Sequence, residues 1–121
     1  MHIDAALEAI LLQYWGYTSF RPNQKEVITS ICEKKDTLLL LATGGGKSIC
    51  YQVPGIYLGG LTLVISPLVA LMHDQVHQLT HRGIAAAYID ASLTFRETQI
   101  IYDNVASGHI KFLYISPERL Q

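Results

Sequence analysis

Residues 38–48 combine residue types that can hold a phosphate group: four leucines, an alanine, a threonine, three glycines, a lysine and a serine. The short apolar run is typical of a buried parallel strand, and the glycines allow a turn in which successive backbone N–H groups point into one concavity. In such a loop the lysine reaches the β and γ phosphates of a nucleotide, and the serine hydroxyl binds Mg²⁺ at the start of a helix. The candidate phosphate-binding residues are therefore Thr43, Gly44, Gly45, Gly46, Lys47 and Ser48.

The match to a phosphate-binding loop is incomplete. The pattern G-x-x-x-x-G-K-[ST] requires a glycine where this chain has Leu41, so only Gly46-Lys47-Ser48 fits it strictly. The alternative is an ordinary glycine-rich turn whose lysine is merely solvated. The order of apolar run, glycines, lysine and serine favours the phosphate site.

Two helices are expected ahead of this loop. Asp4 is expected to cap the first, which carries Leu7, Ile10 and Leu11 on one face and ends near Gly16. Pro22 opens the second at a first-turn position, and the apolar stripe of that helix is Val27, Ile28 and Ile31.

Strands and helices alternate along the rest of the chain. The expected strands are 37–41, 61–65, 85–89 and 112–115, and the expected helices between them are 47–52, 68–79 and 94–105. Such alternation predicts an α/β fold, a three-layer parallel sheet with helices on both faces.

Composition limits the class of protein. The chain has 121 residues, half of them hydrophobic, which suits one globular domain with a real core. It has neither an apolar stretch long enough to span a bilayer nor a signal-peptide start, so we expect no membrane contact and a cytoplasmic location. Cys32 and Cys50 are expected to be buried or half-buried thiols. A formal charge of −1 means that any binding of nucleic acid must be local.

Two of the expected strands end in Ser-Pro, at Ser66-Pro67 and Ser116-Pro117. Each serine is expected to be an N-cap with a proline at the first helical position, so that each junction presents a helix N-terminus. Both junctions should lie at the carboxyl edge of the sheet, where α/β folds bind ligands. They are either ordinary helix caps or contacts to anions such as nucleic-acid phosphates.

The chain resembles the N-terminal part of RecQ-type DNA helicases, which belong to helicase superfamily 2. Four blocks carry the resemblance, and together they cover nearly the whole chain: residues 14–24, 42–52, 64–76 and 114–120. The family implies an incomplete RecA-like lobe, with N-terminal helices and an adenine-reading motif in residues 1–35 and the core of the lobe in residues 36–121. ATP and Mg²⁺ are the implied cofactors.

The resemblance also implies roles for particular residues. Tyr17 would stack on adenine, while Arg21 and Gln24 would address the edge of the base, where a glutamine amide offers both a donor and an acceptor. The blocks at 64–76 and 114–120 look like the family's contacts to the single-stranded DNA backbone. The candidate DNA-binding residues are Ser66, Pro67, His73, Ser116 and Arg119.

Two residues depart from the family. Ala42 stands where proline is common, which should alter loop stiffness more than chemistry. His73 stands where a lysine is often found, so we expect a weaker phosphate contact there.

The implied function is ATP-driven 3′ to 5′ movement along single-stranded DNA with unwinding of duplex and of duplex junctions, in DNA repair and recombination. This would place the protein in the nucleoid of a bacterium or the nucleus of a eukaryote. The family's Asp-Glu-x-His motif and second lobe are expected beyond Gln121, so the chain alone should contact nucleotide but hardly hydrolyse it. The alternatives are a nucleotide-binding fragment without motor activity and another phosphate-loop enzyme such as a small-molecule kinase.

Three further sets of polar residues could be functional sites but are better explained by structural roles. His73, His77 and His81 share one helix face, but the glutamate of the zinc motif H-E-x-x-H is missing. Asp90 ends an apolar run and could be a magnesium carboxylate, but no second acidic residue follows it. Glu118 is explained more simply by the helix dipole than as a catalytic base.

Overall fold

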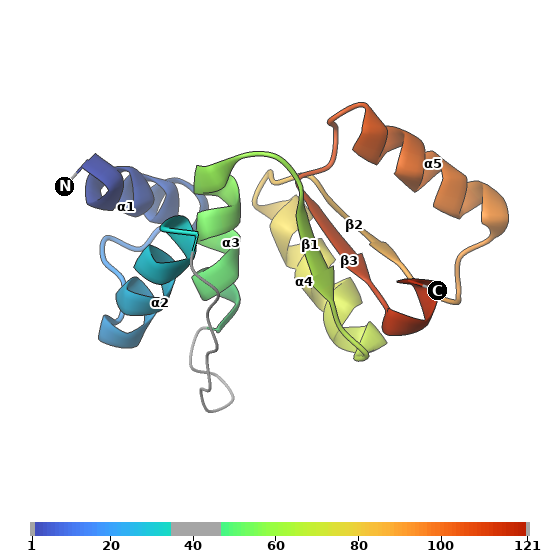
Figure 1. The fold of residues 1–121 in the computed structure, drawn as a ribbon, viewed down its shortest axis with the longest axis horizontal. Coiled ribbons are helices and arrows are strands. Elements are labelled where there is room, and N and C mark those ends of the chain that lie inside the picture. Colours follow the sequence, from blue (N-terminus) through green and yellow to red (C-terminus); the bar gives the residue numbers. More distant parts are fainter. Residues whose placement is uncertain (1, 35–46, 121) are drawn as a thin grey trace. The chain divides into compact units, whose positions relative to one another are not determined.

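The computed structural model describes residues 2–34 and 47–120 (Figure 1). Two compact units divide the chain, Met1–Gly59 and Gly60–Gln121, and each has its own core. The expected strand at 37–41 and the candidate residues Thr43, Gly44, Gly45 and Gly46 lie outside the described residues.

The first unit contains three helices, α1 (His2–Trp15), α2 (Pro22–Cys32) and α3 (Lys47–Leu58). The third helix packs against both of the others. Their apolar faces meet in one cluster of buried side chains, made up of Leu7, Leu11, Ile28, Cys32 and Val53. The predicted apolar face of the first helix is thereby confirmed, as is Pro22 at the start of α2. The predicted stripe of the second helix is only partly right, because Ile28 is buried while Val27 and Ile31 are half-buried and the buried face continues through Cys32.

Two helix boundaries differ from the expectation. The first helix begins at His2, so Asp4 lies within its first turn and is not the N-cap. There its carboxylate interacts favourably with the positive end of the helix dipole. One carboxylate oxygen of Asp4 lies 3.6 Å from the Nζ of Lys25. The third helix continues past Gln52 to Leu58 although Pro54 removes one backbone N–H. Burial of Val53 and Pro54 in the first unit offsets that loss.

The second unit is built on a parallel three-stranded sheet. Its strands are β1 (Thr62–Ile65), β2 (Ala86–Ile89) and β3 (Phe112–Ile115), in the order β1-β3-β2. The register pairs Ile65 with Ile115 and Ile89 with Ile115, so the three strands end level with one another. The carboxyl ends of all three therefore form one edge.

Helices cover both faces of this sheet. On one face, Ile89, Leu113 and Ile115 are buried against Ile101 and Val105 of α5 (Phe95–Ala106). Because side chains alternate along a strand, Phe112 and Tyr114 point to the opposite face, where α4 (Val69–His81) packs. A short 3₁₀ helix, η1 (Pro117–Leu120), follows β3. The predicted arrangement of a parallel sheet between helices is confirmed for the second unit.

Cys32 and Cys50 are both buried and belong to no disulfide bond, as expected. Burial raises the pKa of each thiol above its usual value. Within the described part of the chain, no helix is long and apolar enough to cross a membrane.

Candidate nucleotide and nucleic-acid sites

A pocket in the first unit forms where α1 gives way to α2. Its volume is about 470 Å³. Gly16 ends α1 with a φ of 76°, and its N–H donates to the carbonyls of Leu11 and Leu12. This left-handed conformation, which favours glycine, turns the chain into the loop of residues 17–21 that lines the pocket. Ile49 of α3 completes the lining.

Gln24 is the buried polar residue among those that line this pocket. Its side chain is 4 % exposed, and its Oε1 accepts a hydrogen bond from the backbone N–H of Arg21 at 2.9 Å. That bond satisfies one of the N–H groups left open at the start of α2 and holds the amide in one orientation. A buried amide oriented in this way can read the edge of a base by hydrogen bonding.

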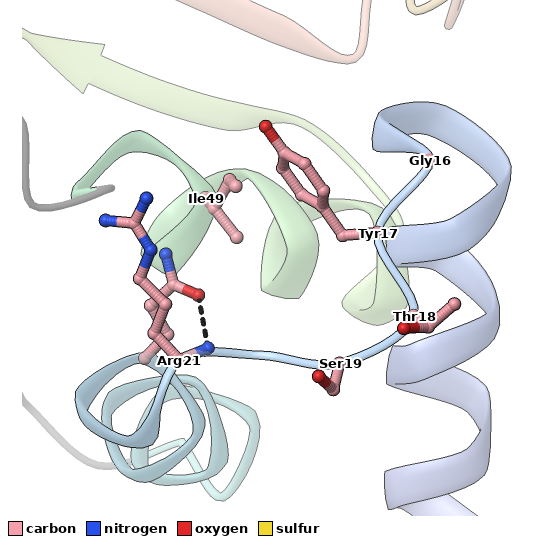
Figure 2. Close-up of a pocket in the computed structure, with 7 residues that line it drawn as sticks. Gly16, Tyr17, Thr18, Ser19, Arg21 and Ile49 are labelled. Atoms are coloured by element: carbon pink, nitrogen blue, oxygen red, sulfur yellow. Dashed lines mark hydrogen bonds between the residues drawn. The ribbon is translucent and has the colours of Figure 1, made fainter.

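Tyr17 and Arg21 lie on either side of Ile49 in the same pocket (Figure 2). The tyrosine is 56 % exposed, so the face of its ring is open to a ligand. An aromatic face, a guanidinium group and an oriented amide suit a planar heterocycle with polar edges. The structure thus brings together the three residues that the sequence associates with adenine.

Lys47 and Ser48, the two described residues of the predicted phosphate-binding loop, begin α3. Lys47 is the first residue of this helix and is exposed, and Ser48 is half-buried. The N–H groups of the first helical turn have no partner within the helix and point along the axis toward its positive end. Ile49, the next residue, lines the pocket that contains Tyr17, Arg21 and Gln24. One helix therefore carries both the phosphate-binding candidates and one wall of the pocket.

In the second unit, the two Ser-Pro junctions lie next to each other. Ser66 and Ser116 follow the paired residues Ile65 and Ile115, and the N–H of Ser66 donates to the carbonyl of Ile115 at 3.1 Å. The prediction that both junctions lie at the carboxyl edge of the sheet is confirmed.

The predicted capping role of Ser66 is wrong. The helix after it begins at Val69 with Leu68 as the N-cap residue, so Pro67 does not occupy the first helical position. The hydroxyl of Ser66 instead accepts a hydrogen bond from the N–H of Leu68 at 3.1 Å, which forms a local turn before the helix. Serine side chains compete for nearby backbone N–H groups in this way, and the sequence could not distinguish a turn from a cap.

The second junction differs from the first. Pro117 does begin a helical turn, but the turn is the four-residue η1. Ser116 is fully buried, and its hydroxyl has no hydrogen-bond partner among the described residues. Arg119 lies in η1, and its Nη2 donates to the hydroxyl of Thr98 on α5 at 3.0 Å. One donor of this guanidinium is thus used within the protein, and an arginine side chain has five.

His73 and Asp90 form a contact that sequence reasoning missed. The Nε2 of His73 on α4 lies 2.6 Å from Oδ2 of Asp90, directly after β2. Ser92 donates to the other carboxylate oxygen through its backbone N–H at 2.8 Å and also through its hydroxyl. Tyr88 lies against the imidazole ring, with the two ring centroids 4.0 Å apart.

Asp90 therefore has a structural part in joining the end of β2 to α4. Its side chain is buried, and burial by itself would raise the pKa of the carboxyl group. The hydrogen bonds from Ser92 and His73 outweigh burial and hold the pKa below its usual range. The signal available in the sequence was Asp-x-Ser after an apolar run, a pattern typical of an Asx turn.

The three histidines of α4 line one cavity on the surface of the second unit, together with Tyr88 of β2. Figure 1 shows α4 and β2 within that unit. Among residues 2–34 and 47–120, no group of three or more histidine, cysteine, aspartate or glutamate side chains is placed to hold a metal ion.

Comparison with known proteins gives one family. The sequence profile of the DEAD/DEAH box helicases matches residues 21–121. The chain is 50 % identical over 111 residues to the ATP-dependent DNA helicase RecQ of Pasteurella multocida, a match that covers 92 % of this chain and 18 % of the relative.

Two further relatives are similar over the same region. The ATP-dependent DNA helicase RecQ of Haemophilus influenzae is 46 % identical over 112 residues, 93 % of this chain and 18 % of the relative. The probable ATP-dependent DNA helicase RecS of Bacillus subtilis is 47 % identical over 116 residues, 95 % of this chain and 23 % of the relative. The chain thus spans about a fifth of the length of these curated relatives.

Proposed function

Because the chain belongs to the DEAD/DEAH box helicase family, we propose that it is the ATP-binding segment of a RecQ-type DNA helicase. The whole protein would couple ATP hydrolysis to 3′ to 5′ movement along single-stranded DNA and to duplex unwinding, in DNA repair and recombination. The observation that carries the ATP-binding part is the base pocket of the first unit. It combines Tyr17, Arg21 and Gln24 with a wall from the helix that begins at Lys47.

The residues of the first unit suit ATP. A volume of about 470 Å³ is within the range of small-molecule sites. Tyr17 would stack on adenine, and the amide of Gln24 would read its edge, which carries a donor and an acceptor side by side. Lys47 would hold the β and γ phosphates, and the Ser48 hydroxyl would be a ligand of Mg²⁺. The metal ion would neutralise charge on the phosphates.

The loop glycines complete this site in the proposal. Thr43, Gly44, Gly45 and Gly46 would supply backbone N–H groups to the phosphates. Hydrolysis needs, in addition, groups that position water and stabilise the transition state.

DNA would bind at the carboxyl edge of the sheet in the second unit. The N–H of Ser66 is bound to the carbonyl of Ile115 and Pro67 has no N–H, so the backbone donors to phosphate near that edge would be the first-turn N–H groups of α4, which begins at Val69. Arg119 would contribute a charged contact with its remaining donors. His73 would bind phosphate only with the ring nitrogen that does not face Asp90. For Ser116, burial of the hydroxyl favours a role in holding the turn over a direct contact with phosphate.

A protein with this activity would act where DNA is, in the nucleoid of a bacterium or the nucleus of a eukaryote. Its partners would be single-stranded DNA and duplex junctions. A small-molecule kinase is the less favoured alternative, because the matching profile is that of helicases.

The sharpest test separates the two roles of Gln24. Gln24→Glu retains an oxygen for the N–H of Arg21 but removes the amide donor. Titration of the 121-residue chain with fluorescent ATP and GTP analogues should show a preference for ATP in the unmodified chain. The preference should be lost in Gln24→Glu, and circular dichroism should show that the helix content of the variant is unchanged.

Two outcomes would contradict the proposal. Equal affinity of the unmodified chain for ATP and GTP would remove the adenine assignment. In the full-length protein, Lys47→Ala should abolish ATP turnover, and single-stranded DNA should stimulate turnover in the unmodified enzyme. Turnover that ignores DNA would refute the helicase assignment.

A further inference from the structure

Strand β2 lies at one edge of the sheet formed by the described strands, where the sheet order places it beside β3 alone. The carbonyl groups of Ala85 and Ile89 accept hydrogen bonds from Phe112 and Ser116, each at 3.2 Å. In a parallel ladder alternate residues face the same neighbour, so Ala86 and Tyr88 direct their N–H and C=O groups to the opposite side. Within the described sheet, two residues of β2 thus present an open hydrogen-bonding edge.

An apolar groove runs along this edge on the side of α5. Its volume is about 360 Å³. Its lining residues are Val76, Ala86, Ala87, Tyr88, Leu93, Ile100 and Ile101, with Glu97 as the only charged residue among them. Ile100 is 49 % exposed although it lies on the wall of this groove. An apolar groove beside a free strand edge can accept every second side chain of an added strand.

The other side of the same edge is lined by imidazoles. A cavity of about 640 Å³ is bordered by His73, His77 and His81, and it shares Val76 and Tyr88 with the apolar groove. Imidazole rings can donate N–H groups to carboxylate oxygens. No carboxylate of the described second unit lines this cavity; that of Asp90 is buried behind His73.

We propose that the β2 edge binds an extended peptide by strand addition, in which acidic and apolar residues alternate. The backbone of the peptide would pair with Ala86 and Tyr88. Its acidic side chains would point to the histidines of α4, and its apolar side chains would occupy the groove of Ile100. This is a protein-interaction site, separate from the nucleotide pocket and from the carboxyl edge of the sheet.

Charge favours a peptide over a second copy of this chain. Pairing β2 with β2 of another copy would continue the sheet and bring two rows of histidines onto adjoining surfaces. The histidines of one copy would then face the histidines of the other. Carboxylates, which complement imidazole N–H donors, would be missing between them. A peptide with alternating acidic residues supplies them.

The test uses the 121-residue chain and a short fluorescent peptide in which aspartate and valine alternate. Fluorescence anisotropy should show saturable binding of this peptide and at least about tenfold weaker binding of the matched lysine–valine peptide. Ile100→Asp should weaken binding at least about tenfold, because it places a charge on the apolar wall. Phe95→Asp is the matched control, because Phe95 is 86 % exposed on the same helix but lies outside the groove, and binding should be unchanged.

A second variant tests the backbone pairing. Ala86→Pro removes an N–H that points to the free edge, a position where edge strands tolerate proline. It should weaken binding at least about tenfold, whereas Ala86→Thr should bind as the unmodified chain does; circular dichroism should show unchanged helix content in both. The proposal is overturned if the aspartate–valine peptide does not bind, or if Ile100→Asp and Ala86→Pro bind it normally. Self-association of the chain that Ala86→Pro abolishes, without peptide binding, would also overturn it in favour of a second copy.

Discussion

Replacing Asp90 by asparagine should destabilise the second unit. Asp90 is 1 % exposed and receives hydrogen bonds from the backbone and hydroxyl of Ser92 and from His73. Asparagine has nearly the same shape and keeps one oxygen for Ser92. Its other terminal atom is an NH₂ donor, which cannot accept from the imidazole of His73.

The size of the effect follows from these contacts. A hydrogen bond to a charged group contributes about 1.5–3 kcal/mol, against about 1 kcal/mol for a neutral bond. The imidazole of His73 is 40 % exposed, so water screens the contact and can replace it in part. Asparagine carries no charge, so the variant also avoids the free-energy cost of burying one, which offsets part of the loss. We expect Asp90→Asn to lower the unfolding free energy of the second unit by about 1 kcal/mol, and Asp90→Ala to lower it by about 2 kcal/mol.

The difference in unfolding free energy between the unmodified chain and Asp90→Asn should depend on pH. The pKa of Asp90 is lower in the folded chain than in the unfolded chain, because the hydrogen bonds from Ser92 and His73 outweigh its burial. The resulting stability is present above the unfolded value of about 3.9 and is lost as pH falls through the folded value. The unmodified chain should therefore begin to lose its advantage over Asp90→Asn as the pH falls through about 4, and the advantage should be gone below the folded pKa, where both carry a neutral side chain.

Urea titrations followed by NMR cross-peaks of the β3 amides would measure the second unit by itself. The matched control is Asp103→Asn, which changes an exposed carboxylate on α5 and should alter stability by less than about 0.5 kcal/mol. A difference between Asp90→Asn and the unmodified chain that stays constant from about pH 7 to about pH 3 would refute the reasoning, because it would mean that the charge of Asp90 contributes nothing.

Three further changes test other parts of the structure. Gly16→Ala should lower the unfolding free energy of the first unit by about 1 kcal/mol because of the φ of 76° alone, since open space surrounds the new Cβ. Trp15 fluorescence in urea would measure this change, and an unchanged unfolding midpoint would contradict the left-handed turn. Thr94→Ala removes the hydroxyl that accepts from the N–H of Glu97 at 3.1 Å and should cost about 1 kcal/mol in the same NMR assay, with Thr94→Ser restoring stability. Burial raises the pKa of both cysteine thiols, so in the folded chain they should react with a disulfide reagent at least about tenfold more slowly than in urea; equal rates would show that they are accessible.

Much of the fold could be predicted because its signals are local. The alternation of short apolar runs with helical patterns gave three strands and two covering helices whose bounds agree with the structure within two residues. Pro22 at the start of α2 and Thr94 at the start of α5 are visible in the sequence, since caps involve residues only a few positions apart.

The errors lie where local signals allow two outcomes. Ser66-Pro67 can form a cap or a turn, and here the Ser66 hydroxyl binds the N–H of Leu68 and the helix begins at Val69. The third helix was expected to end at Gln52, yet it continues to Leu58, with Val53 and Pro54 buried in the first unit.

The sequence alone predicted the candidate nucleotide-binding residues. The order of glycines, lysine and serine pointed to Lys47-Ser48, whereas Tyr17, Arg21 and Gln24 were predicted from the resemblance to RecQ-type helicases. Only the tertiary structure showed that Ile49 joins the wall of a pocket with Tyr17 and Arg21 and that Gln24 is held by the N–H of Arg21. It alone paired His73 with Asp90 and placed β2 at the edge of the sheet formed by the described strands. These contacts join separate elements, and no periodicity in the chain encodes which side chains meet across a sheet.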